Sequence, residues 1–478
     1  MTRPSLAFSG SPGMAAMYAA AVTNLLDTNI VAARTDRSPS NSSDPGRYIR
    51  AGGGYPDPWT RDAALNCWGA GSILAPAVAG DTLRMVCDVR ADGRRIIAQD
   101  SQWWDQIIWV IAAWQHCLVT GDRDFVAESY QIGMDSLDIL NQRHFRANIG
   151  LYAGGSLMQD GISGYPHPLN EPDSTSTFVL DYPASHEIMC LSTNAIYVEA
   201  HRALADMAEV LGLDPGPLRT AADRISGAVN EHLWIEETGL YGYFIHGSGD
   251  LAGTLDRHQE AAGLALVVAF GIADKRRADR VLSGTHREPY GVVNVWPHFP
   301  ERFSDEYPGR HNVMCWPMVM GLFGDAAARA GRADVVYETL RSFQLLTQAS
   351  DNHFFELYNP VTGAVDGGWQ LGKHWASEPD QTWSATAFLR LVHTGVVGIR
   401  YGTGGITFAP TVPEALGALS LNAFPYRKAL LDITVSGSGD RVAAIELDGR
   451  DVTAAPVQVA ADLTGSHQVQ IRLTRDSR

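Results

Sequence analysis

The chain has 478 residues, of which 45% are hydrophobic and 19% charged, and its formal net charge is −16. Such an acidic chain is a poor partner for nucleic acid or an anionic membrane, because both bind basic surfaces. It contains no apolar run of about 18 residues that would span a membrane. Its first residues lack a basic region followed by an apolar core, so we expect no secretory signal and a cytoplasmic location.

The cysteines are odd in number and widely spaced, at Cys67, Cys87, Cys117, Cys190 and Cys315. Most lie in apolar surroundings, which predicts reduced core residues rather than disulfides. Neither His298 nor His311 is followed by a second histidine at zinc-ligand spacing, and no cysteine pairs with them. We therefore expect neither a metal nor another cofactor.

Before residue 400, apolar residues recur at helical spacing in a series of segments. These segments are 12–34, 61–79, 102–119, 124–145, 186–211, 216–233, 258–273, 275–284, 311–331, 333–348 and 381–396. Short breaks such as "TGDRD" and "GRAD" fit antiparallel helix pairs joined by tight turns. The pattern predicts a mainly α protein, with an (α/α)6 barrel of six helical hairpins over residues 1–400.

After residue 400 the pattern changes. The stretches "GITFAPTVP", "KALLDITVSGSG" and "VAAIELDGRDV" alternate apolar and polar residues, with glycine and Asp-Gly turns between them. This alternation predicts a small C-terminal antiparallel β-sandwich over residues 401–478.

Four long loops separate the helical segments, at 35–60, 146–185, 285–310 and 350–380, and they are rich in Gly, Pro, Trp, Tyr and Asp. Loops of this length in a compact domain are usually functional or disordered, and the aromatic content argues against disorder. We therefore expect the functional site to lie in these loops.

The first motif is "YPDPWTRDAALN", which contains Tyr55, Trp59, Arg61 and Asp62. Asp62 falls in the first turn of a predicted helix, where an acid is favoured by the helix dipole. The pair of Arg61 and Asp62 could be no more than a surface ion pair. The neighbouring aromatics instead favour a sugar subsite, because Trp offers a flat apolar face and Arg and Asp bind adjacent hydroxyls.

The second motif is "QWWDQIIW", which places Trp103, Trp104 and Asp105 in the first turn of the helix predicted over 102–119. They would face a central cavity if this helix belongs to an inner ring. Two adjacent tryptophans cannot both face the same side, so one of them is expected to be a core residue.

Two further loops carry candidate residues. Asp160 lies in "SLMQDGISGYP" with Tyr165, ahead of a long helix that carries Asn194 among apolar residues, and on its own it would be an ordinary turn aspartate. Trp316 ends an aromatic segment, "VWPHFPERFSDEYPGRHNVMCW", whose rings we expect to form subsite walls.

The fourth loop contains "NHFFELYNPVTGAVDGGWQLGKHW", in which aromatic side chains surround Glu356. Burying an unpaired carboxylate is costly, so Glu356 is paired, exposed or held for chemistry. As a structural residue it would pair with Arg341 or Lys373.

Together these motifs resemble the six-hairpin glycosidases. "PWTRDAALN" and "SLMQDGISGYP" followed by "HEIMCLSTNAIYVEA" are similar to segments of debranching-type amylo-α-1,6-glucosidases, and this resemblance implies that Asp160 is a general acid. "FFELYNPVTG" resembles a segment of trehalases and processing glucosidases whose glutamate is the general base, which implies that role for Glu356. One departure concerns the acid. In the trehalases and processing glucosidases the acidic Asp directly follows a Ser-Gly-Trp motif, whereas here Ser163-Gly164-Tyr165 is followed by Pro166 and Asp160 lies upstream of it. Asp173 and Asp181 are therefore kept as reserves.

The resemblance implies an inverting, exo-acting glycoside hydrolase that cleaves a terminal, α-glucosidic sugar from a short oligosaccharide or glycoside. The residues expected to bind this small carbohydrate are Tyr55, Trp59, Arg61, Asp62, Trp103, Trp104, Asp105, Tyr165, Asn194, Trp316, Trp369, Gln370, His374, Trp375, Gln381 and Trp383. The sequence gives no indication of oligomeric state.

Three alternatives stay open. A glycoside phosphorylase would need basic residues or backbone amides in place of the base carboxylate. A sugar epimerase would need facing histidines as acid and base, recruited from His298, His311 and His374. A non-catalytic carbohydrate-binding protein would have no need of two acids in aromatic loops.

Overall fold

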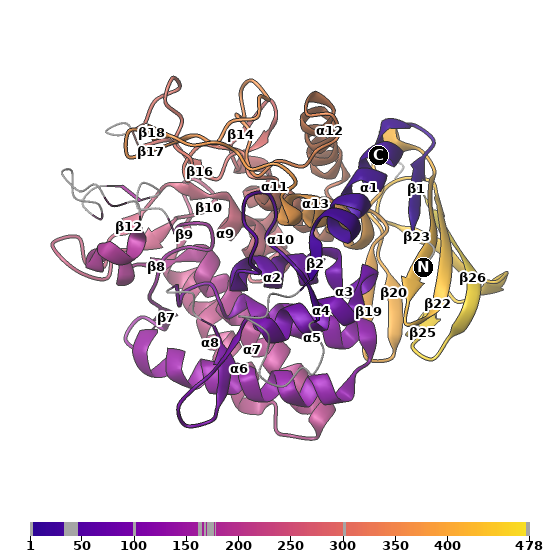
Figure 1. The fold of residues 1–478 in the computed structure, drawn as a ribbon, viewed down its shortest axis with the longest axis horizontal. Helices are drawn as coiled ribbons and strands as arrows, with labels where there is room; N and C mark the ends of the chain where they lie inside the picture. Colours follow the sequence, from indigo (N-terminus) through magenta and orange to yellow (C-terminus); the bar gives the residue numbers. More distant parts are fainter. Residues whose placement is uncertain are drawn as a thin grey trace.

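The structure, a computed structural model, describes residues 3–32, 46–98, 102–160, 165–166, 169, 176, 178–299 and 303–474. Helices predominate up to about residue 400, and the last part of the chain forms sheets that lie against one side of the helices (Figure 1). The helices are α1 (Gly13–Thr23), α2 (Thr60–Asn66), α3 (Ser72–Leu74), α4 (Pro76–Met85), α5 (Ile108–Thr120), α6 (Arg123–His144), α7 (Leu191–Leu211), α8 (Gly216–His232), α9 (Ala261–Ala269), α10 (Lys275–Gly284), α11 (Pro317–Arg329), α12 (Ala333–Ala349) and α13 (Thr382–Arg390).

Six of these helices form a closed ring. Helix α2 contacts α5, α5 contacts α7, α7 contacts α9, α9 contacts α11, α11 contacts α13, and α13 returns to α2. The helices α4, α6, α8, α10, α12 and α1 pack outside this ring. Because an outer helix carries the chain back between successive ring helices, the ring helices run in one direction and begin at the same end.

The sequences of the two kinds of helix reflect these positions. Ring helix α9 reads AAGLALVVA and is buried on nearly every side, whereas outer helix α10 reads KRRADRVLSG and buries only one face. Helix α10 begins at a side-chain cap, since Asp274 accepts a hydrogen bond from the backbone N–H of Arg277. Ring helices α5 and α7 end at Gly121 and Gly212, both in the left-handed conformation that glycine adopts readily.

Several predicted helices differ from the observed ones; the segments 186–211 and 311–331, for example, become helical only at Leu191 and Pro317. The segment 61–79 is broken, because Pro76 has no N–H to donate and starts the separate outer helix α4. The helix predicted from residue 102 begins only at Ile108. Trp103, Trp104 and Asp105 therefore precede this helix instead of lying in its first turn.

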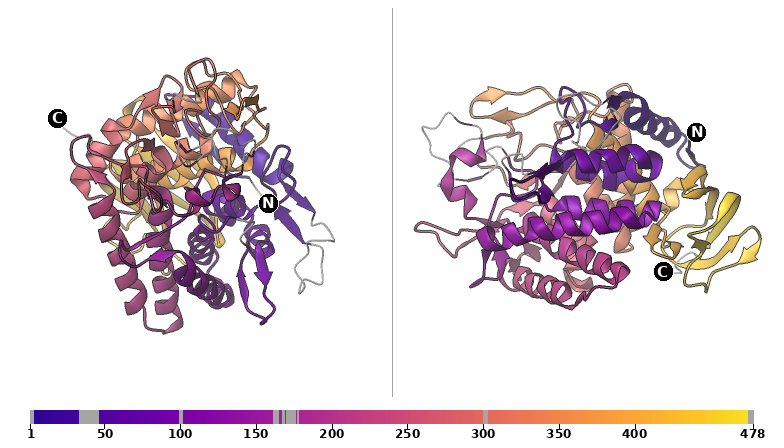
Figure 2. Two further views of the ribbon diagram at one scale, coloured as in Figure 1. Left: turned by 90° about the vertical axis from the view of Figure 1, so that its left-hand side faces the viewer. Right: turned by 60° about the horizontal axis from the view of Figure 1, so that its bottom comes forward.

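The C-terminal region contains two sheets. A six-stranded sheet has the order β1-β21-β22-β26-β23-β24, and a three-stranded sheet has the order β19-β20-β25. Their strands are β1 (Ser5–Phe8), β19 (Ile399–Gly402), β20 (Gly405–Phe408), β21 (Leu419–Tyr426), β22 (Lys428–Ser436), β23 (Val442–Leu447), β24 (Arg450–Asp451), β25 (Val459–Ala460) and β26 (Thr464–Leu473). Figure 2 shows the orange and yellow strands of these sheets at one end of the molecule in its right-hand view.

Two features of the larger sheet were not predicted. Strand β1 comes from the N-terminus and pairs antiparallel with β21, so both ends of the chain contribute to one sheet. Strands β22 and β26 pair in parallel, so the prediction of a purely antiparallel arrangement is wrong for this pair. Alternation between buried and exposed residues marks β22 as a strand, but it does not reveal the direction of its neighbours.

Short two-residue and three-residue strands stiffen the loops between the helices. They are β2 (Ile30–Ala32), β3 (Arg47–Ile49), β4 (Cys87–Val89), β5 (Arg95–Ile97), β6 (Phe145–Arg146), β7 (Leu151–Tyr152), β8 (Met189–Cys190), β9 (Trp234–Ile235), β10 (Leu240–Tyr241), β11 (Phe244–Ile245), β12 (Leu255–Asp256), β13 (Gln259–Glu260), β14 (Arg287–Glu288), β15 (Gly291–Val292), β16 (Val295–Trp296), β17 (Trp369–Gln370) and β18 (Lys373–His374). Many of them, including β8, β12, β17 and β18, lie at the side of the molecule away from the yellow sheets (Figure 1).

All five cysteines are free thiols, as predicted. Within the described parts of the chain, none of the helices has the length and apolarity needed to cross a membrane.

Candidate active site

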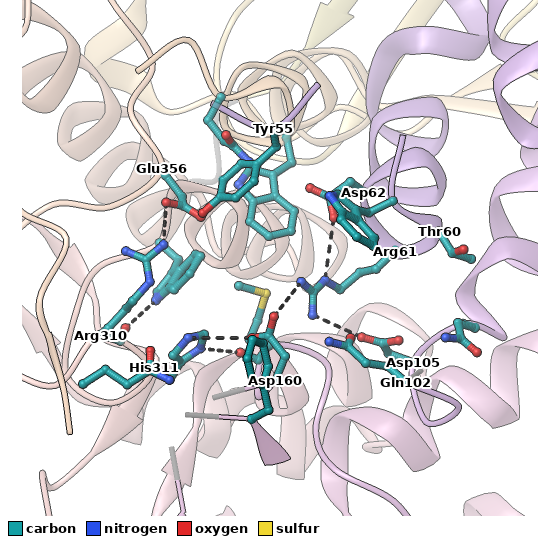
Figure 3. Close-up of a pocket in the computed structure, with 18 of the residues that line it drawn as sticks. Tyr55, Thr60, Arg61, Asp62, Gln102, Asp105, Asp160, Arg310, His311 and Glu356 are labelled. Atoms are coloured by element: carbon teal, nitrogen blue, oxygen red, sulfur yellow. Dashed lines mark hydrogen bonds and ion pairs between the residues drawn. The ribbon is translucent and has the colours of Figure 1, made fainter. Parts of the chain in front are cut away.

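A cavity of about 550 Å³ opens at the end of the ring where the ring helices begin (Figure 3). Its lining comes from the segments that lead into α2, α5, α7, α11 and α13. Twelve of the residues predicted from the sequence line it, namely Tyr55, Trp59, Arg61, Asp62, Asp105, Asp160, Trp316, Glu356, Gln370, Trp375, Gln381 and Trp383. Four of the long loops therefore do meet at one place.

Arg61 is the centre of one charged cluster. Its Nη1 donates to Asp105 Oδ2 at 3.2 Å and to the Leu157 carbonyl at 3.1 Å, and its Nη2 lies 3.7 Å from Asp160 Oδ2. Its Nε lies 4.0 Å from Asp62 Oδ2. The single guanidinium, buried in the wall, thus faces three carboxylates from three different segments.

Glu356 forms a second cluster with Arg310. Arg310 Nη2 donates to Glu356 Oε2 at 2.6 Å, and Arg310 Nη1 donates to the Gly367 carbonyl at 3.0 Å. Both side chains are buried, so the bond joins two charges that are largely shielded from water. Arg310 engages Oε2, the Glu378 backbone gives the carboxylate a further hydrogen bond, and the side chain lines the cavity.

An aromatic ring packs against each of the two arginines. The Arg61 guanidinium lies 5.4 Å from the centre of the Trp383 ring, and that of Arg310 lies 5.4 Å from the Trp316 ring. The indole Nε1 of Trp316 donates to the Arg310 carbonyl at 3.0 Å, which fixes that ring in the wall. The aromatic residues predicted as subsite walls therefore orient the two arginines as well as line the cavity.

The carboxyl groups of the cavity differ in the direction in which their pKa values are shifted. Burial raises the pKa of Asp62 to about 7, against the opposing effect of the Arg61 charge. Burial also raises the pKa of Glu356, and Arg310 offsets only part of that rise. For Asp160, burial favours the neutral form, but the surrounding positive charge, that of Arg61 foremost, outweighs burial and lowers the pKa.

The inner part of the cavity contains a polar side chain with open hydrogen-bonding capacity. Gln381 is 1% exposed, and neither its amide oxygen nor its amide nitrogen has a hydrogen-bond partner among the described residues. Its backbone is fixed, because its N–H donates to the Phe354 carbonyl at 2.8 Å. A buried amide without partners is costly unless a ligand supplies them.

The cavity has an open rim as well as a buried inner part. Phe178 is 65% exposed and Trp59 is 42% exposed, whereas Glu356 is 3% exposed. A ligand can therefore enter with one end towards Glu356 while its other end remains between the rim aromatics.

Six predicted sugar-binding residues do not line the cavity: Trp103, Trp104, Tyr165, Asn194, Trp369 and His374. The Asn194 amide is used structurally, since Oδ1 accepts from the Tyr152 N–H and Nδ2 donates to the Tyr152 and Cys190 carbonyls. Trp103 stacks on His144.

The remaining four also have other contacts. Trp104 and Tyr165 are fully buried in a second hydrophobic cluster. Trp369 packs edge-on against Tyr307, and His374 is exposed and lies 2.8 Å from Asp366 Oδ1.

Sequence reasoning did not identify eight lining residues, namely Thr60, Gln102, Gln106, Met158, Phe178, Leu180, Arg310 and His311. For Arg310 a signal was available, because a glutamate surrounded by aromatics needs a cation. The partners suggested for it were close in sequence or on a nearby helix, whereas Arg310 lies 46 residues before it in another loop. Of the histidines considered for an epimerase, His311 lines the cavity and His298 and His374 do not.

Two acids were kept as reserves for Asp160. Asp181 is exposed and does not line the cavity, and Asp173 lies outside the described residues. Among the described residues, no group of three or more His, Cys, Asp and Glu side chains is arranged to hold a metal ion.

The sequence matches the family model of the "Mannosylglycerate hydrolase MGH1-like glycoside hydrolase domain" over residues 55–384, which is well over half of the chain. The chain belongs to this family. The resemblance to six-hairpin glycoside hydrolases is therefore confirmed, and the protein is a glycoside hydrolase whose substrates contain a sugar.

Solved structures resemble this glycoside hydrolase in fold. A GH63 mannosylglycerate hydrolase from Thermus thermophilus in complex with glucose has a TM-score of 0.58 and 17% identity, over 79% of this chain and 99% of that one. A sialidase has a TM-score of 0.68 and 16% identity, over 94% of this chain and 40% of that one. A GH78 rhamnosidase of a Bacillus species has a TM-score of 0.59 and 15% identity, over 99% of this chain and 44% of that one.

At these identities the likeness shows the fold alone, which is a helix-rich glycosidase fold. The glycoside hydrolase spans less than half the length of the sialidase and of the rhamnosidase. No curated protein matches its sequence.

Proposed function

We propose that this glycoside hydrolase is an inverting, exo-acting enzyme in which Asp160 is the general acid and Glu356 the general base. The observation that carries the proposal is the presence of two carboxyl groups on different sides of one cavity, each beside its own arginine (Figure 3). Inverting glycosidases need such a pair, about 6.5–9.5 Å apart, with room between them for a sugar and a water molecule.

The surroundings of Glu356 suit a base. Arg310 holds Oε2, which favours the ionised form of the carboxylate. The raised pKa of Glu356 makes it a stronger proton acceptor near neutral pH than an exposed carboxylate would be. In the proposed step, water loses a proton to the Glu356 carboxylate while its oxygen forms the new bond to the anomeric carbon.

Asp160 has to be protonated when the sugar is bound. Its side chain is 34% exposed, so a sugar entering the site would remove water from it and shift its pKa upwards. The proton then passes to the leaving oxygen as the glycosidic C–O bond breaks. Arg61, 3.7 Å from Oδ2, stabilises the carboxylate that remains.

The shape of the cavity favours removal of a terminal sugar. Glu356 and Gln381 lie in its buried part, and the exposed aromatics Trp59 and Phe178 lie at its rim. A terminal sugar would meet the open amide of Gln381 and the Arg61 and Asp62 pair, which bind hydroxyl groups. The rest of the substrate would lie between the rim aromatics.

The substrate that we propose is a short oligosaccharide or a small glycoside with a terminal hexose. The resemblance to debranching-type glucosidases supports an α-glucoside, and the name of the family supports glycosides of glycerate. We also propose that residues 1–400 are an (α/α)6 barrel and residues 401–478 a β-sandwich, with β1 as an N-terminal addition to the sandwich.

Product stereochemistry tests the proposal. Proton NMR would follow the anomer released from α-glucosides, glucosylglycerate and mannosylglycerate, with and without phosphate, for wild type, Asp160→Asn and Glu356→Gln. We expect hydrolysis with inversion, independent of phosphate and lost in both variants. Asp181→Asn is the matched control, because Asp181 lies on the same loop but outside the cavity lining, and it should keep full activity. Turnover that requires phosphate and survives Glu356→Gln would instead make the enzyme a phosphorylase.

A further inference from the structure

Two hydrogen bonds tie the loop that carries Asp160 to the loop that leads into α11. His311 Nδ1 lies 2.8 Å from the Met158 carbonyl oxygen, and the side-chain Nε2 of Gln159 donates to the His311 carbonyl at 2.6 Å. His311 is 7% exposed and Gln159 is fully buried. This reciprocal pair of bonds fixes the backbone on the N-terminal side of Asp160.

The first of these bonds also determines where the imidazole proton lies. A carbonyl oxygen only accepts, so His311 Nδ1 must carry the hydrogen. Burial lowers the pKa of His311 to about 4, and the neutral ring therefore has no proton on Nε2 near neutral pH. The lone pair of Nε2 faces Asp160 Oδ1 at 3.7 Å (Figure 3).

The two oxygens of Asp160 consequently have different neighbours. Oδ2 faces the Arg61 guanidinium, which favours negative charge there, whereas Oδ1 faces a nitrogen lone pair, which repels negative charge and attracts a hydroxyl. The preferred place for a proton is therefore Oδ1. The distance of 3.7 Å is longer than a hydrogen bond, but such contacts often tighten once substrate fills the site.

We propose that, once a sugar fills the cavity, His311 is a positioning residue that favours a proton on Asp160 Oδ1, ready to donate to the leaving oxygen. The proposal rests on the assignment of Asp160 as the general acid. During the step the Oδ1–H bond breaks, the proton moves to the glycosidic oxygen, and the negative charge left on Asp160 is held by Arg61 at Oδ2. His311 stays neutral throughout and gains no proton.

The other charges near Asp160 make such a residue useful. Arg61, a protonated His311 and Arg310 all favour the ionised form of Asp160. The carboxylates of Asp62 and Glu356 oppose it. A protonated His311 would add to the effect of the arginines, whereas the neutral ring does not. The neutral tautomer thus removes one of the influences that would ionise the acid too early.

Two substitutions separate the lone pair from the hydrogen bond. His311→Phe removes both, and His311→Asn keeps an amide N–H for the Met158 carbonyl but has no atom at the Nε2 position. For both variants we expect the alkaline limb of the kcat profile, which reports the enzyme–substrate complex, to move to lower pH by about one unit, which is about a tenfold loss of rate above the limb.

Leaving-group dependence gives a second readout. Alkyl glycosides need the acid's proton, whereas glycosyl fluorides of the same sugar need far less assistance. Both His311 variants should therefore lose about tenfold in kcat on alkyl glycosides at alkaline pH, and should keep nearly full activity on the fluoride. The same comparison on Asp160→Asn should give a larger loss of the same kind.

The Asp160→Asn arm distinguishes two failures. If Asp160→Asn shows no dependence on the leaving group, the acid assignment and hence the proposed function fail. If Asp160→Asn shows it but the folded His311→Asn loses activity on all substrates equally, with an unmoved alkaline limb, His311 only supports the loop and the inference is overturned.

Discussion

The ring of helices contains buried charges at two levels, and the two groups are satisfied to different extents. Towards the ends of α11 and α13, the buried Asp325 accepts hydrogen bonds from Arg390 at 3.1 Å, Thr394 at 2.7 Å and Arg329 at 3.2 Å. Opposing burial, these arginines hold the pKa of Asp325 well below its usual range. At the other level, where the ring helices begin, Glu356 has one oxygen held by Arg310 and lines the cavity.

The difference separates a structural ion cluster from a candidate catalytic one. A buried carboxylate whose oxygens are both engaged fixes the packing of its helices and has nothing left to offer a ligand. A carboxylate that is held by an arginine and also lines a cavity is positioned and still open to a ligand. Burial and an arginine partner are common to both, so neither feature alone identifies the site.

The largest expected effect is on kcat, from a substitution at the end of the ring that carries the cavity. Glu356→Gln should lower kcat by about 10³-fold, because an amide cannot take a proton from water. The fold should persist, since Arg310 keeps its bond to the Gly367 carbonyl. Steady-state kinetics and circular dichroism would measure the two quantities. The matched control is Glu288→Gln, a part-buried glutamate that pairs with His286 outside the cavity lining and should leave kcat unchanged.

At the structural level the expected result is the reverse. Asp325→Ala should cost about 3–5 kcal/mol of unfolding free energy, because it leaves the buried Arg390 without its carboxylate. Urea denaturation would measure this loss. Asp334→Ala is the control, since the exposed pair of Asp334 with Arg332 should contribute less than about 1 kcal/mol. An Asp325→Ala protein that is as stable as wild type yet inactive would contradict the division between the two levels.

A third buried carboxyl, that of Glu260, allows the comparison to be extended through the pH dependence of the protein's stability. Burial raises the pKa of Glu260 to about 7, although Oε2 accepts a hydrogen bond from the Ser192 N–H at 3.0 Å. The folded protein therefore holds this proton more tightly than the unfolded chain does. Stability should fall as pH rises from about 4.5 through 7, by about 3 kcal/mol once both states are ionised.

Glu260→Gln should remove that slope. The amide oxygen can still accept from Ser192, and an uncharged side chain has no ionised form to destabilise. Thermal melts at about pH 5 and about pH 8 would show a variant more stable than wild type at the higher pH and similar to it at the lower one. An unchanged difference between the two pH values in the variant would mean that Glu260 is not the group responsible, and would turn attention to Asp62, whose pKa is raised to about the same value.

Much of the fold and part of the site could be predicted from local sequence. Helical periodicity located α6, α8, α10 and α12 to within a residue or two of their bounds, because each has one apolar face and clear end signals. Motif and aromatic context brought attention to Asp160 and Glu356, which do share one cavity.

Long-range relations were harder to predict. The pairing of Arg310 with Glu356 joins two loops, and the parallel pairing of β22 with β26 joins two strands, and neither leaves a trace in local alternation or spacing. The late start of α5 also mattered. It placed Trp104 in a core cluster, although a helix beginning at residue 102 would have turned one of the tryptophans towards the cavity.

The smallest effect that we expect compares two residues that were both predicted to bind sugar. Gln381→Leu should raise KM about fivefold with little change in kcat, because its buried amide lacks partners among the described residues and can bind a sugar hydroxyl, and one such bond contributes about 1 kcal/mol. His374→Ala should change KM less than about twofold, since His374 is exposed, lies against Asp366 and does not line the cavity. Initial rates over a range of substrate concentrations would measure both. Equal effects on KM would mean that His374 itself reaches the substrate, and that the cavity lining does not mark the full extent of the binding site.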